Sequence, residues 1–146
     1  MKVAWGSDNP SHPISQAVES ALKELGHSLL NVSNESMSWV DVGLSVGEAV
    51  SKQQARRGIV ACYTGTGVAI AANKVPHVRA AVINDSDLAE MTRLWNHTNV
   101  LAFSMRDTKP ESVLEILKIW MKTPNGAEER PQIDKLDAYE RMNTRQ

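Results

Sequence analysis

The segment from residue 58 to residue 74, GIVACYTGTGVAIAANK, constrains the fold of this chain more than any other part of the sequence. Residues 58–63 are apolar and partly β-branched, which is typical of a strand covered on both faces. The TGTG sequence at 64–67 removes side-chain bulk where the chain has to turn sharply. Residues 68–74 are rich in alanine and predict a short helix. The segment therefore predicts a buried strand, a glycine turn and a helix in direct succession.

Cys62, the only cysteine of the chain, stands immediately before this turn. The first turn of a helix leaves backbone N–H groups without intrahelical partners, so the predicted turn is suited to holding an oxyanion. A thiol beside a helix N-terminus is also favoured in its reactive thiolate form. The alternative is that Cys62 is one more small buried residue of the strand, and its position alone does not separate the two roles. The turn matches neither the dinucleotide-binding fingerprint nor the P-loop pattern.

The composition narrows the class of protein and of partner. A chain of 146 residues that is 42% hydrophobic and 23% charged is typical of one globular domain, which we expect to span 1–146. The net charge of −1 implies no basic face, so no nucleic-acid partner is expected. One cysteine excludes an internal disulfide and fits a reducing cytoplasm. We expect no membrane association, because the sequence has neither a signal peptide nor an apolar run long enough to span a bilayer.

Strand and helix patterns alternate along the chain. Strands are predicted at 2–5, 28–32, 58–63, 79–83 and 99–103, and helices at about 13–25, from 41 to between 52 and 57, and at 68–74, 87–95, 108–122 and 133–142. The alternation predicts a single three-layer α/β/α, Rossmann-like domain with a five-stranded parallel sheet. Right-handed crossovers make the first and third strands neighbours with a ligand crevice at their carboxyl ends, and they leave the order of the last two strands open.

Local signals predict how several helices begin and pack. Asp41 is expected to be a helix N-cap rather than a site residue. Residues 108–111, TKPE, predict a capping box with proline in the first turn. Asp8 follows the first strand and either faces the crevice or caps the next helix. The last helix carries a narrow apolar stripe, which is expected to pack on a partner subunit and consists of Ile133, Leu136 and Tyr139.

Three blocks of the sequence resemble a known family. CYTGTG at 62–67, followed by IAANKVP at 70–76 and VRAA at 78–81, resembles the signature of ribose-5-phosphate isomerase B and galactose-6-phosphate isomerase. NHTNVLAF at 96–103 resembles the second signature of that family, and GSD at 6–8 resembles its N-terminal motif. The resemblance runs over nearly the whole chain. It implies an aldose–ketose isomerase that acts on a small sugar or sugar phosphate through a cis-enediolate, without a cofactor or metal, as a cytoplasmic homodimer or tetramer.

The resemblance also implies roles for individual residues. Cys62 matches the thiolate base, and Asp8 matches an acid/base associated with opening of the sugar ring. Thr64 and the backbone amides after it match an oxyanion-binding turn, whose residues are Gly65, Thr66, Gly67, Val68 and Ala69. Asn96 matches a substrate-binding asparagine. Arg106 and Arg130 match arginines that hold a phosphate, partly across a subunit interface, because a guanidinium pairs with phosphate in a planar fork.

The sequence departs from the family pattern at several of its site positions. Asn9 and Trp95 stand where the family has histidines, the first for phosphate binding and the second for ring opening. A second arginine shortly after Arg130 is absent, and residues 41–43 read DVG where the family has Asp-Tyr-Pro with its tyrosine near the substrate. His12 and His97 lie close to the vacated positions, which leaves two roles open for each: a ligand for the substrate or, as the more common role, an exposed loop histidine.

These departures leave three readings of the function. The first is an active isomerase whose substrate differs from ribose 5-phosphate, being open-chain, short or differently decorated. The second is a non-catalytic or weakly active subunit of a hetero-oligomeric sugar-phosphate isomerase, and the third is a sugar-binding module. Retention of Cys62 favours the first reading, because a thiol is the group that a purely supporting subunit does not need.

Overall fold

Five parallel strands form the middle layer of the structure, a computed structural model that describes residues 1–34 and 36–143. The strands are β1 (Lys2–Ser7), β2 (Ser28–Asn31), β3 (Arg57–Cys62), β4 (Ala80–Val82) and β5 (Val100–Ser104). Their order across the sheet is β2-β1-β3-β5-β4. The predicted five-stranded parallel sheet is confirmed, and so is the prediction that β1 and β3 are neighbours. β5 lies inside the sheet, while β4 forms one edge.

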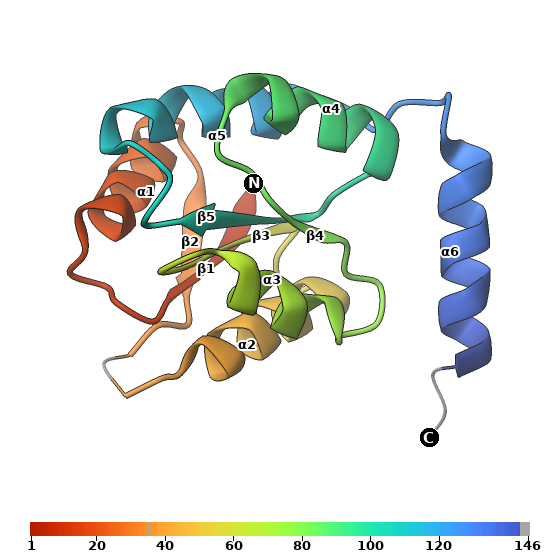
Figure 1. Ribbon diagram of the computed structural model, residues 1–146, viewed down its shortest axis with the longest axis horizontal. Coiled ribbons are helices and arrows are strands. Elements are labelled where there is room, and N and C mark those ends of the chain that lie inside the picture. The colour runs from red at the N-terminus through yellow and green to blue at the C-terminus, as the bar shows by residue number, and fades with distance from the viewer. Residues whose placement is uncertain (35, 144–146) are drawn as a thin grey trace.

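Helices cover both faces of the sheet (Figure 1). One face carries α1 (Pro13–Glu24), α4 (Ser86–Asn96) and α5 (Val113–Lys122), and the other carries α2 (Trp39–Ser51) and α3 (Thr66–Asn73). The strands run toward the left of Figure 1, so the loops that follow β1, β3 and β5 meet there. We call this end of the sheet the carboxyl edge and the opposite end the amino edge. Within the described part of the chain, no helix is long and apolar enough to cross a membrane.

Alternating strand residues bury their side chains in two separate cores, one on each face of the sheet. The core under α1 and α5 includes Trp5, Ile59, Phe103, Leu117 and Trp120. The core under α2 and α3 includes Val42, Val46, Val60, Val68 and Val100. Because β3 is the central strand, all of its residues are buried, which explains its nearly continuous apolar sequence. Cys62 ends this strand and belongs to the core under α2 and α3.

Two of the predicted helix caps are wrong in detail. The N-cap of α2 is Ser38, whose hydroxyl accepts a hydrogen bond from the N–H of Asp41 at 3.2 Å. Asp41 is the capping-box partner at the third helical position, and its carboxylate accepts from the N–H of Ser38 at 3.3 Å. The box predicted at 108–111 does not form, because the Thr108 hydroxyl donates to Asn84 Oδ1 at 3.0 Å. A short 3-10 helix (Pro110–Ser112) precedes α5 instead.

The last helix, α6 (Arg130–Asn143), stands apart from the three layers (Figure 1). It is slightly longer than the predicted 133–142, and only Ile133 of its residues is buried. Three further apolar side chains are more than half exposed: Leu136 (52%), Tyr139 (68%) and Met142 (71%). A helix with this much exposed apolar surface lacks a partner for most of its stripe within one chain.

Candidate active site

The end of β3 brings Cys62 to the carboxyl edge, between the ends of β1 and β5. Cys62 is level with Ser104 of β5 on one side. On the other side, Ala61 is level with Ser7 and accepts a hydrogen bond from the backbone N–H of Asp8 at 3.4 Å. Neighbouring strands lie about 4.8 Å apart, so the structure brings the predicted residues Cys62 and Asp8 side by side.

Gly65 fixes the path of the turn that follows Cys62. Its φ angle is 75°, in the left-handed region that side chains disfavour. A Cβ atom at this position would lie 3.0 Å from backbone atoms of Phe103 and Ser104 in β5. Glycine is therefore needed both for the conformation and for the close approach, and the turn is held against the end of β5.

The helix after this turn begins at Thr66, earlier than the predicted residue 68. Its N-cap residue is Gly65, and no side chain caps the first turn by a hydrogen bond. The first backbone N–H groups of α3 therefore have no intrahelical acceptors and no side-chain cap. The hydroxyls of Thr64 and Thr66 are 2.7 Å apart and form a hydrogen bond with each other. This turn supplies donors for an oxyanion immediately after Cys62.

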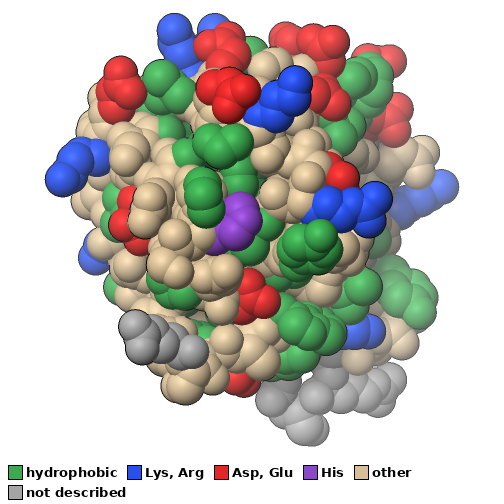
Figure 2. Space-filling view, turned by 60° about the vertical axis from the view of Figure 1, so that its left-hand side comes forward, with side chains coloured by type: hydrophobic (Ala, Val, Ile, Leu, Met, Phe, Trp, Pro, Cys, Tyr) green, Lys and Arg blue, Asp and Glu red, His purple; other side chains and the backbone are tan. Residues whose placement is uncertain are grey.

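Arg106 extends the site at the end of β5. Its backbone N–H donates to the carbonyl of Tyr63 at 2.8 Å, and the N–H of Met105 donates to the carbonyl of Cys62 at 3.0 Å. The Arg106 side chain is 62% exposed and pairs with Asp107 at 3.2 Å. Figure 2 turns this edge toward the viewer and shows hydrophobic side chains and a histidine near its middle, with most lysines and arginines toward the margin.

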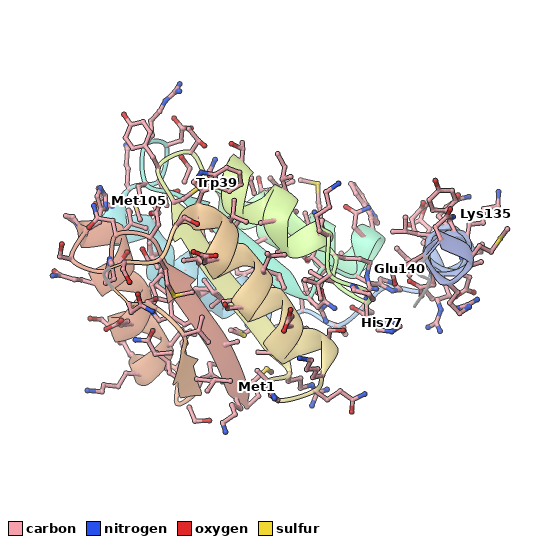
Figure 3. All side chains as sticks on the ribbon, turned by 90° about the horizontal axis from the view of Figure 1, so that it is seen from below. Met1, Trp39, His77, Met105, Lys135 and Glu140 are labelled. Atoms are coloured by element: carbon pink, nitrogen blue, oxygen red, sulfur yellow. The ribbon has the colours of Figure 1, made fainter. Side chains whose placement is uncertain are left out.

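Trp39 lies beside the candidate site, a position that the sequence motifs do not indicate. It is the first residue of α2, and a Cβ atom at Gly67 would lie 2.9 Å from its indole ring. The ring therefore covers the first turn of α3, while the residue remains 44% exposed. Figure 3 shows Trp39 and Met105 toward the same end of the molecule, the carboxyl edge. Residues 41–43 carry no aromatic side chain, and Trp39 is the aromatic residue that lies against this turn; its signal in the sequence is a tryptophan directly after a serine N-cap.

The loop after β1 places Asp8, Asn9 and His12 differently. Burial raises the pKa of the Asp8 carboxyl above its usual value, and a backbone hydrogen bond offsets part of that rise. Asn9 stays within the loop, where its N–H donates to Ser7 Oγ at 3.0 Å. His12, rather than Asp8, is the N-cap of α1, because its Nδ1 accepts from the N–H of Ile14 at 3.1 Å.

Trp95, Asn96 and Arg130 lie at the amino edge, away from Cys62. Asn96 ends α4 just before β5 begins, whereas Cys62 is level with Ser104 at the far end of β5. The length of β5, about 13 Å at 3.3 Å per residue, separates the two groups along the strand direction. Arg130 begins α6, which follows α5 at the same side of the molecule (Figure 1). Within one chain, therefore, the predicted site residues form two sets that do not meet.

The neighbours of this amino-edge set are engaged in structural contacts. His97 was expected to be an exposed loop histidine, and this is wrong because only 3% of it is exposed. It ends α4 with a φ angle of 50°, and its Nε2 lies 2.7 Å from the carbonyl oxygen of Gly126. Arg130 pairs with Asp134 one turn further along α6 at 3.0 Å.

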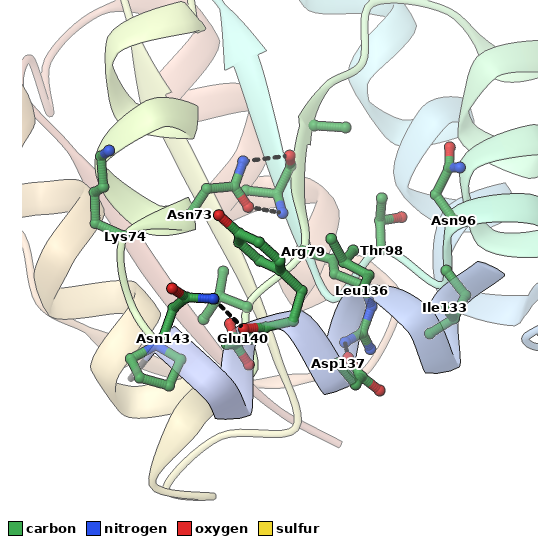
Figure 4. A pocket seen from close by; sticks show the side chains of 15 residues that line it. Asn73, Lys74, Arg79, Asn96, Thr98, Ile133, Leu136, Asp137, Glu140 and Asn143 are labelled. Atoms are coloured by element: carbon green, nitrogen blue, oxygen red, sulfur yellow. Dashed lines mark hydrogen bonds and ion pairs between the residues drawn. The ribbon is translucent and has the colours of Figure 1, made fainter. Parts of the chain in front are cut away.

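A cavity of about 790 Å³ lies between α6 and the sheet, and not at Cys62 (Figure 4). On the α6 side it is lined by Ile133, Leu136 and Tyr139, and on the opposite side by residues that include Asn73, Lys74 and Asn96. Asn73 is fixed in the wall by two hydrogen bonds to Ala80, one from its Nδ2 to the carbonyl at 2.9 Å and one to its Oδ1 at 2.7 Å. We call this cavity the α6 groove.

Comparison with known proteins places these observations in a family. A family model described as Ribose/Galactose Isomerase matches residues 3–136. The chain is 34% identical to the putative sugar phosphate isomerase YwlF of Bacillus subtilis, over 98% of this chain and 99% of the relative. It is 28% identical to the D-erythrulose-4-phosphate isomerase of Pectobacterium atrosepticum, over 100% of this chain and 99% of the relative.

A solved structure supports the same assignment. The ribose-5-phosphate isomerase B of Clostridium thermocellum superimposes with a TM-score of 0.91 at 36% identity, over 99% of this chain and 100% of that one. The α/β fold and the enzyme class predicted from the signature blocks, an aldose–ketose isomerase with an unspecified substrate, are thereby confirmed. The chain belongs to the ribose/galactose isomerase family.

Proposed function

We propose that this chain interconverts the aldose and ketose forms of a small sugar phosphate, with Cys62 as the base that moves a proton between C1 and C2. The observation that carries the proposal is the position of Cys62 beside the uncapped first turn of α3, with Asp8 directly after the adjacent strand β1. The thiolate removes the C2 proton of the aldose, and the electron pair forms the C1–C2 double bond of an enediolate. Return of that proton to C1, together with transfer of the O2 proton to O1, gives the ketose.

The turn and Asp8 would stabilise and protonate the oxygens of this intermediate. Backbone N–H groups of the first turn of α3 and the Thr64 hydroxyl would donate to the developing oxyanion, which is where donors lower the barrier most. The raised pKa of Asp8 helps its carboxyl retain a proton that it can exchange with a sugar oxygen. The exposed guanidinium of Arg106 is available at the same edge for a phosphate.

The replaced histidines support a substrate that needs no ring opening. Trp95 stands where the family has a ring-opening histidine, and an indole N–H is a donor that does not exchange its proton at neutral pH. A four-carbon sugar phosphorylated on its terminal hydroxyl cannot close a furanose ring, so it would not require that histidine. One relative is named for such a compound, D-erythrulose 4-phosphate. We therefore propose a short, open-chain sugar phosphate in preference to ribose 5-phosphate.

A second copy of the chain would complete the site. Asn96, Trp95 and Arg130 lie at the amino edge, whereas Cys62 is level with the last residue of β5, so they do not meet within one chain. The α6 groove and the exposed side chains of Leu136, Tyr139 and Met142 provide an apolar surface beside Asn96 on which another subunit can pack. In a two-fold dimer, these three amino-edge residues of each copy would lie at the carboxyl edge of the other copy, which gives two equivalent sites.

Proton exchange in deuterated water tests the proposal directly. The purified protein is incubated with erythrose 4-phosphate, ribose 5-phosphate and the unphosphorylated sugars, and the C2 proton is followed by NMR. We expect the fastest loss of the C2 signal with the four-carbon phosphate. Cys62→Ser and Cys62→Ala should both abolish exchange, because neither side chain can act as a base, while the far-ultraviolet circular dichroism stays unchanged.

Two results would separate the parts of this proposal. Wild-type exchange by the Cys62→Ser variant would show that Cys62 is not the base. Turnover of ribose 5-phosphate that matches or exceeds that of the four-carbon sugar would leave the base in place but refute the substrate. In that case Asp8 or His12, the titratable side chains of the loop after β1, would be the ring-opening candidates.

A further inference from the structure

A second cavity, of about 680 Å³, opens at the amino edge of the sheet, at the opposite end from Cys62. Its wall comes from the end of α2 and the loop after it, the loop before β4 and the residue before β5. The lining residues are Val50, Ser51, Gln53, Ala55, Arg56, His77, Arg79 and Asn99. None of them is acidic, and two of them carry guanidinium groups. We call this the basic cavity.

The charge around the basic cavity is strongly positive. Arg57 and Arg93 are buried close by, and burial lowers the pKa of each to about 10. The positive charge of Arg56 contributes to the lowering at both residues, and Arg79 contributes at Arg93. Four arginines thus lie near enough to repel one another, and a bound anion would relieve that repulsion.

The carboxylates that face this region come from α6 and leave one arginine without a partner. Asp137 lies 3.6 Å from Arg79, and Glu140 lies 3.7 Å from His77 Nδ1 (Figure 3 shows His77 and Glu140 close together). Both carboxylates line the α6 groove and not the basic cavity. Within residues 1–34 and 36–143, no ion pair or side-chain hydrogen bond involves the guanidinium of Arg56.

Hydrogen bonds hold the wall of the cavity in one shape. The Asn99 side chain accepts from the N–H of Arg79 at 2.7 Å and donates to the carbonyl of His77 at 2.8 Å. The Arg79 side chain is oriented by donation from Nε to the carbonyl of His97 at 3.0 Å. Gln53 and His77 adopt positive φ angles of 60° and 69°, a conformation that costs energy for residues other than glycine. The backbone wall and the Arg79 guanidinium are therefore preorganised before any ligand arrives, while the exposed Arg56 side chain has no partner among the described residues that holds it.

We propose that the basic cavity binds the phosphate group of a small metabolite, with the guanidinium groups of Arg56 and Arg79 as its ligands and His77 at its margin. Guanidinium groups suit a phosphate because each presents two parallel N–H donors. None of the residues that line the basic cavity is assigned to the reaction, so we treat it as a separate binding site that does not depend on the isomerase proposal. Arg79 also lines the α6 groove, so bound phosphate and Asp137 would compete for the same guanidinium.

Titration with inorganic phosphate at constant ionic strength tests this site in the full chain. Backbone amide signals of Gln53, His77 and Asn99 are followed by NMR, and those of residues 65–68 report on the carboxyl edge separately. We expect saturable shifts at the cavity residues. Arg56→Gln should weaken this binding by about tenfold or more, because it removes a charge-assisted pair of hydrogen bonds.

A matched control lies on the same loop. Lys52 is exposed, pairs with Glu48 at 3.1 Å and does not line the cavity, so Lys52→Gln should leave the phosphate affinity unchanged. Arg56 is exposed, so the Arg56→Gln variant is expected to fold. Backbone amide signals outside the cavity that match those of the wild type check this. Shifts confined to residues 65–68, an equal response to sodium chloride, or an unchanged affinity of Arg56→Gln would each overturn the proposal.

Discussion

The guanidinium of Arg57 donates to the carbonyl oxygen of Trp120 at 2.7 Å and lies 5.2 Å from the centroid of the same residue's indole ring. It also donates to the carbonyl of Met121 at 3.0 Å. Arg93 makes a similar bond to the carbonyl of Thr123 at 3.0 Å. These carbonyls lie at the end of α5, where the helix has no N–H groups left to satisfy them. Two buried cations therefore hold the C-terminal end of α5 and favour its dipole.

Replacement of Arg57 by methionine should lower the free energy of unfolding by about 2–3 kcal/mol, because buried carbonyls lose charge-assisted donors. Equilibrium unfolding in urea measures the change. Arg56→Gln is the control, since this neighbouring side chain is exposed and should alter stability by less than about 0.5 kcal/mol. Equal effects of the two substitutions would contradict the role assigned to Arg57.

Alanine at Gly65 should destabilise the protein and also impair the reaction. The strained φ angle alone costs about 1 kcal/mol, and the clash of a Cβ with β5 at 3.0 Å adds to it. Gly26→Ala is a matched control, because Gly26 has a φ angle of 80° but nothing within 4 Å of the added Cβ. We expect the control to lose about 1 kcal/mol and keep its activity. Similar losses in both variants would mean that the approach to β5 is unimportant.

Asp8→Asn should change stability and activity in opposite directions. Because the folded pKa of Asp8 is raised, the folded state binds more protons than the unfolded state between pH 3.8 and the raised value, and stability falls as pH rises through that window. The variant should therefore be more stable than wild type at pH 7, with the difference disappearing below pH 3.8. Loss of a proton-transfer group should reduce kcat by about 10²–10⁴-fold. An Asp8→Asn variant that is less stable than wild type at pH 7 would contradict the predicted direction of the stability change.

Mixing two inactive variants tests whether the site is shared. Cys62→Ser damages the carboxyl edge and Asn96→Ala the amino edge, so a mixed dimer contains one site built from two undamaged sets. An equimolar mixture that has exchanged subunits should recover about a quarter of wild-type activity, because half of the dimers are mixed and each has one working site. A mixture of Cys62→Ser with Asp8→Asn should recover none, since both changes lie at the same edge. Equal behaviour of the two mixtures would exclude a shared site.

Restoring the two family histidines should change the substrate. Asn9→His and Trp95→His together are expected to raise kcat/KM for ribose 5-phosphate, because they return a ring-opening acid and a phosphate contact. Each charge-assisted contact to phosphate is worth about 1.5–3 kcal/mol, so the gain for a cyclic phosphosugar should be at least tenfold. The rate of C2 proton exchange with ribose 5-phosphate in deuterated water measures this gain. No gain on ribose 5-phosphate would show that other groups limit the substrate range.

Much of the fold was predictable because its signals are local. The strand, glycine turn and helix around Cys62 follow from apolar content and glycine spacing in one continuous segment, and the structure confirms them within a few residues. The position of β5 inside the sheet was not predictable, because strand order depends on packing between distant segments. The capping box predicted at 108–111 does not form for the same reason. The Thr108 hydroxyl donates a hydrogen bond to Asn84, which is distant in the sequence.

Sequence motifs name candidate site residues, but they do not show how those residues meet in space. Motif matching assigned Cys62 and Asn96 to one site, although the predicted parallel sheet implies opposite edges, because Cys62 ends one strand and Asn96 precedes another. His97 was mistaken for a loop histidine because its partner, the Gly126 carbonyl, lies beyond α5. Trp39 was missed because its contact with Gly67 joins the starts of two helices.

The separation of Cys62 from Asn96 also bears on how damaged copies of the gene would behave. If the site is shared, a chain with Cys62→Ser still contributes its intact amino-edge residues to the site of a wild-type partner. Activity in a cell that makes both chains would then fall in simple proportion to the damaged fraction. A chain damaged at both edges would spoil two sites at once, and activity would fall with the square of the healthy fraction. Sharing a site between two subunits thus leaves a single-edge lesion no more harmful than in an unshared site, but makes a lesion at both edges more harmful.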